Sequence, residues 1–381
     1  MSKRIIVNLS VVLFLTIALV TTVIAINKNE PVEETVVIVP EEKEVIVEKE
    51  VIVEKVVPKT PETELEEPVI EVMEPLFINE LSGLPIDEEK QWDRPFAVTI
   101  SNIEYAMPQY GISNAEIIYE TLAEGGIPRM LAVFKDFETE KIGPIRSARH
   151  YLLDLAADSN AIFVHYGKSP QATSAFNQLG AEHLDGMTAL DLIMCYQDPS
   201  RNRPHSTFTS TELLQAGLEY KGYSELISED SPKRFTFGSE AVVLDGTDAI
   251  DASNVVLPYS WFDPSFEYDA ETGLYNRFQY GSEQIDASTG NQLTFTNIIV
   301  QSVDMWGIPG DSEGRLDMTL FGTGAGYYIT GGKAVPITWE REGHSTQTYY
   351  YNEDGSPITI SPGKTFISIF PAYNFTNITF E

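Results

Sequence analysis

The sequence predicts an α+β fold, in which an N-terminal α/β sandwich with a mixed sheet precedes a β-rich C-terminal domain. Helical and strand patterns alternate between residues 76 and 231, as expected for α/β layers. Beyond residue 235, aromatic and β-branched residues separated by Gly, Asn and Pro turns predict strands. The chain of 381 residues is long enough for two such domains and an additional segment.

The expected elements of the N-terminal domain, residues 76–231, follow from its apolar patterns. Short apolar runs predict buried strands, and apolar residues at helical spacing predict helices. A cluster of Ser, Glu, Asp and Pro near residues 228–233 marks the domain boundary. We expect strands at 96–100, 130–134 and 161–165, helices at 151–158 and 211–220, and a helix or strand end at 115–122.

The C-terminal domain, residues 232–381, contains a glycine-rich segment at 322–326 (GTGAG). This segment resembles a phosphate loop, but it lies between predicted strands, and we therefore expect a hairpin turn. Cys195 is the single cysteine, so it cannot form an intramolecular disulfide, and its apolar sequence neighbours predict a buried position. Strands are expected at 275–280, 296–303, 327–330 and 334–339.

The composition is strongly acidic and limits the class of partner. The chain has 25 Lys and Arg residues against 57 Asp and Glu residues, which gives a net charge of −32. Such a molecule repels phosphate backbones, so we expect no nucleic-acid partner. The sequence also predicts no cofactor and assigns no catalytic residue.

An apolar segment near the start of the chain predicts its location. Lys3 and Arg4 precede residues 5–26, which carry no charge and are long enough to span a bilayer as a helix. We expect a single-pass signal-anchor in the cell membrane, with the bulk of the protein extracytoplasmic. The alternative is a cleavable signal peptide, because residues 23–25 (VIA) suit a cleavage site. No cysteine follows the segment, so lipid attachment is not expected there.

Residues 27–75 differ abruptly in composition from the rest of the chain. The hexapeptide KEVIVE occurs at 43–48 and again at 49–54, and prolines interrupt the segment. A period of six residues does not match a packed helix. We interpret this region as a disordered acidic stalk. The alternative is that its Val-Ile-Val segments add a strand to a partner or to a second copy of the chain.

Loop-borne arginines are the first candidates for a binding site. Arg129 follows a Gly-Gly turn, and Arg146, Ser147 and Arg149 precede the helix expected at 151–158. Two guanidinium groups on the first turn of a helix suit a carboxylate, phosphate or pyrophosphate. The alternative is that these arginines pair with some of the many acidic residues and hold loops in place.

Histidines and hydroxyls in two further loops are candidates for chemistry. His165 and Ser169 follow a predicted buried strand, where α/β folds place functional loops, and Arg203 and His205 lie in a second loop. The histidines could act as general acids or bases and Ser169 as a ligand or nucleophile. These side chains could equally satisfy loop backbone groups. The five histidines lack compact metal-ligand spacing, so no zinc site is expected.

Many short motifs over residues 85–371 resemble the YerB family of bacterial extracytoplasmic lipoproteins, which is described as two domains of unknown function. The resemblance implies a cell-envelope address and a two-domain architecture, but no reaction. The motifs are 94–102 (RPFAVTISN), 108–111, 115–120, 124–126, 143–149 (GPIRSAR), 165–170 (HYGKSP) and 203–205 (RPH), then 268–269, 275–277, 286–293, 297–301 and 322–339.

Two functional hypotheses follow. In the first, an Arg-rich cleft of the N-terminal domain binds an anionic cell-wall component or an envelope protein without catalysis. In the second, the protein is an envelope hydrolase or phosphotransferase acting on phosphate-containing cell-wall precursors. Its strand, Arg-containing loop and helix resemble the LytR-CpsA-Psr phosphotransferases, which hold a lipid pyrophosphate with arginines.

Acidic side chains have two possible roles under these hypotheses. Glu120 and Glu124 lie four residues apart and could hold a metal or pair with the arginines. In the phosphotransferase hypothesis, Glu120 or Asp136 would hold a divalent cation. The candidate ligand-binding residues are Asn102, Glu120, Arg129, Arg146, Ser147, Arg149, His165, Ser169, Arg203 and His205.

Overall fold

The computed structural model describes residues 77–246, 248–259, 262–344 and 346–381, which belong to one compact unit. The predicted membrane segment at 5–26 and the predicted stalk at 27–75 lie outside the described residues. Within the described ranges, no helix is long and apolar enough to cross a membrane.

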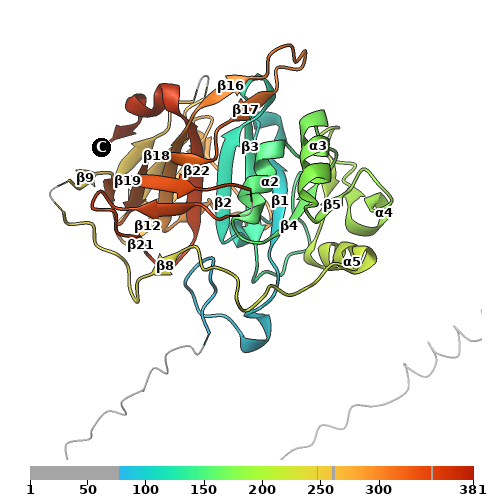
Figure 1. Cartoon of the computed structure of the whole chain (residues 1–381), viewed down its shortest axis with the longest axis horizontal. Helices are drawn as coiled ribbons and strands as arrows, with labels where there is room; N and C mark the ends of the chain where they lie inside the picture. Colours follow the sequence, from blue (N-terminus) through green and yellow to red (C-terminus); the bar gives the residue numbers. More distant parts are fainter. Residues whose placement is uncertain (1–76, 247, 260–261, 345) are drawn as a thin grey trace, which may run out of the picture. The chain divides into compact units, whose positions relative to one another are not determined.

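Strands from both predicted domains join in one mixed sheet (Figure 1). β1 pairs antiparallel with β3 and parallel with β4, and β2 pairs in parallel with β22, where Ile118 lies opposite Phe366. The two predicted domains therefore share a hydrogen-bonded sheet. In order, its described strands are β20 (Tyr349–Tyr351), β19 (Lys333–Arg341), β18 (Gly322–Thr330), β15 (Asn297–Val303), β22 (Thr365–Pro371), β2 (Ile117–Leu122), β3 (Pro128–Phe134), β1 (Phe96–Ser101), β4 (Ile162–His165) and β5 (His183–Asp185), with β9 (Ile250–Asp251) paired to β19.

The remaining strands form one smaller sheet and three short ribbons. The smaller sheet has the order β13 (Ser282–Glu283), β12 (Leu274–Gln279), β11 (Ser265–Asp269), β10 (Asn254–Val256) and β23 (Thr379–Phe380), with β14 (Thr294–Phe295) paired to β12. The ribbons are β16 (Met305–Gly307) with β17 (Leu316–Met318), β21 (Thr359–Ile360) with β8 (Thr236–Phe237), and β6 (Tyr196–Gln197) with β7 (Thr207–Phe208).

The α-helices of the described chain all lie in its N-terminal region. The hydroxyls of Ser169 and Ser210 accept hydrogen bonds from backbone N–H groups in the first turns of α3 and α5. Both helices end at a left-handed glycine, Gly180 (φ 62°) and Gly222 (φ 66°). The helices are α2 (His150–Ala157), α3 (Pro170–Leu179), α4 (Asp191–Met194) and α5 (Thr211–Lys221), and the 3-10 segments are η1 (Glu88–Lys90), η2 (Glu104–Ala106), η3 (Ile112–Asn114), η4 (Glu124–Gly126) and η5 (Ala372–Asn377).

Each face of the main sheet is covered by a separate core. On one face, residues such as Ile118 pack with α4, α5 and the smaller sheet. On the other face, residues such as Tyr119 pack with α2 and α3. This second core extends across the sheet, from side chains of β4 near one end to Trp339 in β19 near the other, and α2 lies over its middle part (Figure 1).

The α+β class with a mixed sheet is confirmed, as are the burial of Cys195 and the strands and helices expected from apolar runs. Residues 115–122, left open between helix and strand, contain β2, and α3 was not predicted. The helical turn expected to hold Arg146 and Arg149 is wrong. Arg149 is extended (φ −122°, ψ 150°), and α2 begins at the next residue.

The hairpin turn expected at 322–326 is also wrong, because this segment is the first half of β18 and pairs with β19. Its glycines have a packing reason. A Cβ atom at Gly324 would lie 2.4 Å from Nε1 of Trp339, and one at Gly326 would lie 2.4 Å from the carbonyl oxygen of Val300. The missing side chain of Gly324 makes room for the indole of Trp339, and that of Gly326 lets the backbone of Val300 approach β18.

Candidate functional site

A pocket of about 250 Å³ lies beside the connection between β3 and α2. Backbone hydrogen bonds hold this connection between two neighbours: Arg146 N donates to Thr99 O (2.8 Å) in β1, and Ile145 N donates to Thr207 O (2.8 Å) in β7. Arg146 lines the pocket that lies among these elements. The lining residues are Ile145, Arg146, Ser147, Tyr166, Met187, Gln197, Arg203, Pro204, Ser206 and Thr207. We call this the arginine pocket.

The two guanidinium groups of the arginine pocket have no acidic partner. Nη1 of Arg146 donates to Pro204 O (3.1 Å), while its Nε is buried without a hydrogen-bond partner. Arg203 is exposed. Neither side chain forms an ion pair within the described residues, and no carboxylate lines the pocket. Burial lowers the pKa of Arg146, because charge is less stable away from water.

Arg129 and Arg149 instead share one carboxylate, that of Glu124. Nε of Arg149 lies 2.8 Å from Glu124 Oε2, and Nη2 of Arg129 lies 3.3 Å from Oε1. Burial acts to raise the pKa of Glu124, but the two guanidinium groups more than offset this and lower it to about 2. Of the two roles open for Glu124, the structure shows the arginine pair. Arg129 also donates to Ser147 O (3.0 Å), which ties this cluster to the wall of the arginine pocket.

The predicted histidines lie in different surroundings. Nδ1 of His205 lies 3.3 Å from Ser101 Oγ, and burial followed by the charge of Arg146 lowers its pKa. His165 is fully buried; its Nδ1 donates to Gly167 O (2.8 Å), and its Nε2 lies 2.9 Å from Nδ1 of His183. Burial lowers the pKa of His165 to about 3. His165 therefore belongs to the core, and Ser169 caps α3 as described above.

Asn102 and Glu120 lie on the opposite side of the main sheet from Arg129. Side chains alternate along a strand, so Glu120 shares a face with Ile118 rather than with Tyr119. Glu120 Oε1 accepts from Asn102 Nδ2 (2.5 Å) and Arg277 Nη2 (2.9 Å). Asp136, the other carboxylate considered for a cation, pairs with Lys90 (2.7 Å). The described residues contain no cluster of three potential metal ligands.

Comparison with known proteins places these features in a family. Residues 81–224 match the protein of unknown function (DUF3048) N-terminal domain, and residues 250–367 match the DUF3048 C-terminal domain. The chain belongs to the DUF3048 family. It is 30% identical over 303 residues to "Putative lipoprotein YerB" of Bacillus subtilis (strain 168), covering 78% of this chain and 88% of the relative.

The crystal structure of the YerB protein from Bacillus subtilis matches with a TM-score of 0.70 at 28% identity, covering 80% of this chain and 99% of that one. The resemblance predicted from the sequence is thus confirmed. Within the DUF3048 framework, the arginine pocket lies entirely in the N-terminal domain, whereas the ion pair of Glu120 and Arg277 joins the N-terminal domain to the C-terminal one.

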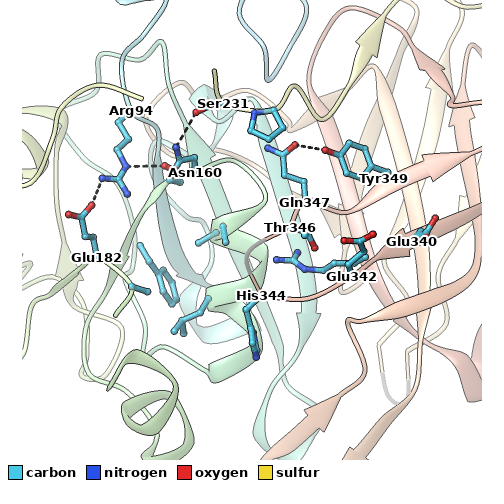
Figure 2. Close-up of a pocket in the computed structure, with 18 of the residues that line it drawn as sticks. Arg94, Asn160, Glu182, Ser231, Glu340, Glu342, His344, Thr346, Gln347 and Tyr349 are labelled. Atoms are coloured by element: carbon cyan, nitrogen blue, oxygen red, sulfur yellow. Dashed lines mark hydrogen bonds and ion pairs between the residues drawn. The ribbon is translucent and has the colours of Figure 1, made fainter. Parts of the chain in front are cut away.

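A larger pocket of about 710 Å³ lies between the two DUF3048 domains (Figure 2). The C-terminal end of α2 and the start of β4 face the β19–β20 hairpin across it. Its residues range from Arg94 to Tyr351 and form no contiguous motif, which explains why the sequence did not reveal it. We call this the interdomain pocket.

A Gly-x-Ser-x-Gly pattern, which holds the nucleophilic serine in α/β hydrolases, occurs at residues 310–314. Here it lies between β16 and β17 rather than between a strand and a helix, so it does not have the structural context of that motif.

Proposed function

We propose that this DUF3048 protein is a membrane-attached, extracytoplasmic protein that binds an anionic ligand in the arginine pocket. The uncharged segment at 5–26 and the word lipoprotein in the name of the Bacillus relative support the location. The observation that carries the proposed binding is the lining of the pocket, which has two arginines and no carboxylate in a chain of net charge −32.

The chemistry of the pocket favours an anionic group. Arg146 and Arg203 offer guanidinium donors that suit the oxygens of a phosphate or carboxylate. The buried Nε of Arg146 has no acceptor within the described residues, and an anion would supply one. The volume of about 250 Å³ fits one such group and its immediate neighbours rather than a large ligand.

Binding without catalysis is the simpler proposal for this site. A transfer reaction needs a nucleophile beside a base, or a metal held by carboxylates. The side chains considered for those roles have other partners: Ser169 caps α3, His165 bonds to Gly167 and His183, and Glu120 pairs with Arg277.

Thermal unfolding of the full chain in detergent, with and without pyrophosphate at constant ionic strength, tests the proposal. A ligand at 100 times its dissociation constant adds about 2.7 kcal/mol of stability. We expect an increase in Tm that the Arg146→Ala/Arg203→Ala variant loses. Arg315→Ala/Lys333→Ala is the control, because these two residues pair with Asp311 and Asp251 outside the arginine pocket and their loss removes the same two charges. The proposal fails if phosphate, pyrophosphate and a carboxylate such as citrate give no shift, or equal shifts in all variants.

A further inference from the structure

The interdomain pocket has an apolar floor and polar walls. The floor comes from small and apolar side chains of α2 and β4, among them Leu153, Ala156 and Phe163. Around it, Figure 2 shows Arg94 and Glu182 on one side, and Glu340, Glu342, His344 and Tyr349 on the other. A concave site of about 710 Å³ with an apolar base and converging polar groups is typical of a small-molecule site.

The charges of the interdomain pocket argue against an anionic ligand. Arg94 is already paired with Glu182 and donates from Nε to Asn160 O (3.0 Å). Glu340 and Glu342 form no ion pair within the described residues, so they leave negative charge at the wall. The interdomain pocket thus differs in sign from the arginine pocket.

Two basic side chains of the pocket wall are held by buried carboxylates. Arg341 is 1% exposed; its Nη1 lies 2.7 Å from Asp158 Oδ1, and its Nη2, which is closed to solvent, forms an ion pair with Asp154 Oδ1 at 4.0 Å. His344 Nδ1 lies 2.6 Å from the carboxylate of Asp154 and donates to it, so Nε2 is the ring nitrogen that is left to meet a ligand. A cation would suit the glutamates but not Arg341. A hydroxyl group, which donates and accepts, suits both the glutamate oxygens and Nε2 of His344.

Two tyrosines extend the polar wall. Tyr349 and Tyr351 are two residues apart on the edge strand β20, so both side chains lie on the same face of it, with Glu340 opposite Tyr349 in the register. Both rings are half-buried and both line the pocket. Such rings combine a flat apolar surface with a hydroxyl, a combination that suits ligands with apolar faces and hydroxylated edges.

We propose that the interdomain pocket binds an uncharged oligosaccharide, whose hydroxyls meet Glu340, Glu342 and His344 while its ring faces lie against Tyr349 and Tyr351. The proposal is independent of anion binding in the arginine pocket, because the two pockets have no lining residue in common.

Calorimetric titration of the full chain in detergent with neutral tetrasaccharides tests the proposal. The panel contains β-1,4-linked N-acetylglucosamine, β-1,4-linked glucose and α-1,4-linked glucose, with spermidine and pyrophosphate as charged probes. We expect at least one tetrasaccharide to bind, and Tyr349→Ala/Tyr351→Ala to weaken it by about tenfold or more. Tyr105→Ala/Tyr220→Ala, which removes two exposed rings outside the pocket, is the matched control and should bind normally.

Further variants separate the outcomes. Arg146→Ala should leave oligosaccharide binding unchanged, because Arg146 lines the other pocket. Glu342→Gln keeps the shape and hydrogen-bonding capacity of the wall, so it should weaken a sugar only mildly but should abolish binding of a cation. Binding of spermidine alone, with loss in Glu342→Gln, would make this a cation site and overturn the proposal. So would the failure of all three tetrasaccharides, or binding that survives loss of both tyrosines.

Discussion

The carboxylate of Glu120 lies 2.9 Å from the guanidinium group of Arg277, and both side chains are completely buried. Glu120 belongs to β2 of the N-terminal DUF3048 domain and Arg277 to β12 of the C-terminal one. Asn102 and Gln284 extend the contact by further hydrogen bonds. The two family domains are therefore joined by buried polar contacts as well as by the pairing of β2 with β22.

Removing one partner of this ion pair should strongly destabilise the protein. Arg277→Met leaves the carboxylate of Glu120 buried without its guanidinium, and such losses are worth about 3–5 kcal/mol. Glu120→Gln/Arg277→Met removes both charges, so its loss should be smaller than the sum of the two single losses. Urea denaturation measures the free energies of unfolding of the unmodified chain, of Glu120→Gln, of Arg277→Met and of the double variant. Strictly additive losses would show that the two side chains do not interact energetically.

Protonation of Glu124 should weaken the fold in acid. Its pKa is lowered from 4.5 to about 2, so its contribution is present above pH 4.5 and is lost as the pH falls towards 2. The loss amounts to at most roughly 3 kcal/mol. Glu124→Gln should be less stable at pH 7 and should change less between pH 4.5 and 2. Glu140→Gln, at an exposed position, is the control and should follow the unmodified chain.

Protonation of the buried His165 and the half-buried His183 should destabilise the protein in a higher pH range than protonation of Glu124. Burial lowers the pKa of His165 to about 3 and that of His183 to about 4, from an ordinary value of 6.5. The unfolded chain therefore takes up protons first, and stability falls as the pH drops from about 6.5 to about 3. His183→Asn should flatten this dependence.

Ring nitrogen chemical shifts measured by NMR give an independent check on the same pair. His165 should remain neutral at pH 5, because its Nδ1 donates to Gly167 O and its Nε2 accepts from His183. A His165 ring that titrates near pH 6.5 would contradict the buried arrangement.

The strands that consist of continuous buried runs could be predicted from the apolar pattern of the sequence. β1, β3 and β4 are apolar runs, and every residue of each is buried. α3 was missed because only Ala172 and Phe176 of its ten residues are buried, which leaves a weak apolar stripe. Its cap signals, Ser169 before Pro170 and Gly180 after the last turn, were nevertheless present.

The candidate site was less predictable because side-chain partners come from distant positions. The sequence brought Arg146, Ser147 and Arg203 into consideration, and the structure shows all three in one pocket. The sequence did not show that Arg149 lies outside this pocket, because Arg149 pairs with Glu124, a residue distant from it in the sequence. The burial of Arg277 was also missed, although alternation in β12 assigns it to the same face as the buried Tyr275.

The glycines of β18 give a prediction that separates a packed strand from a phosphate loop. A Cβ atom at Gly326 would lie 2.4 Å from the backbone oxygen of Val300 in β15, and a backbone atom within a paired sheet cannot move aside easily. We expect Gly326→Ala to lose about 2 kcal/mol or more of stability. Gly307→Ala in β16 is the matched control, because open space surrounds that position, and it should stay within about 0.5 kcal/mol of the unmodified chain.

Phosphate distinguishes the two interpretations of this segment. A packed strand predicts that phosphate changes the stability of Gly326→Ala and of the unmodified chain by the same amount, since the loss arises between β18 and β15. A phosphate loop predicts that the substitution removes stabilisation by phosphate, because backbone N–H groups of the glycines would hold the ligand. Thermal unfolding of Gly326→Ala, Gly307→Ala and the unmodified chain, each with and without phosphate, measures the difference. A variant as stable as the unmodified chain would show that β18 does not approach β15 as closely as the structure places it.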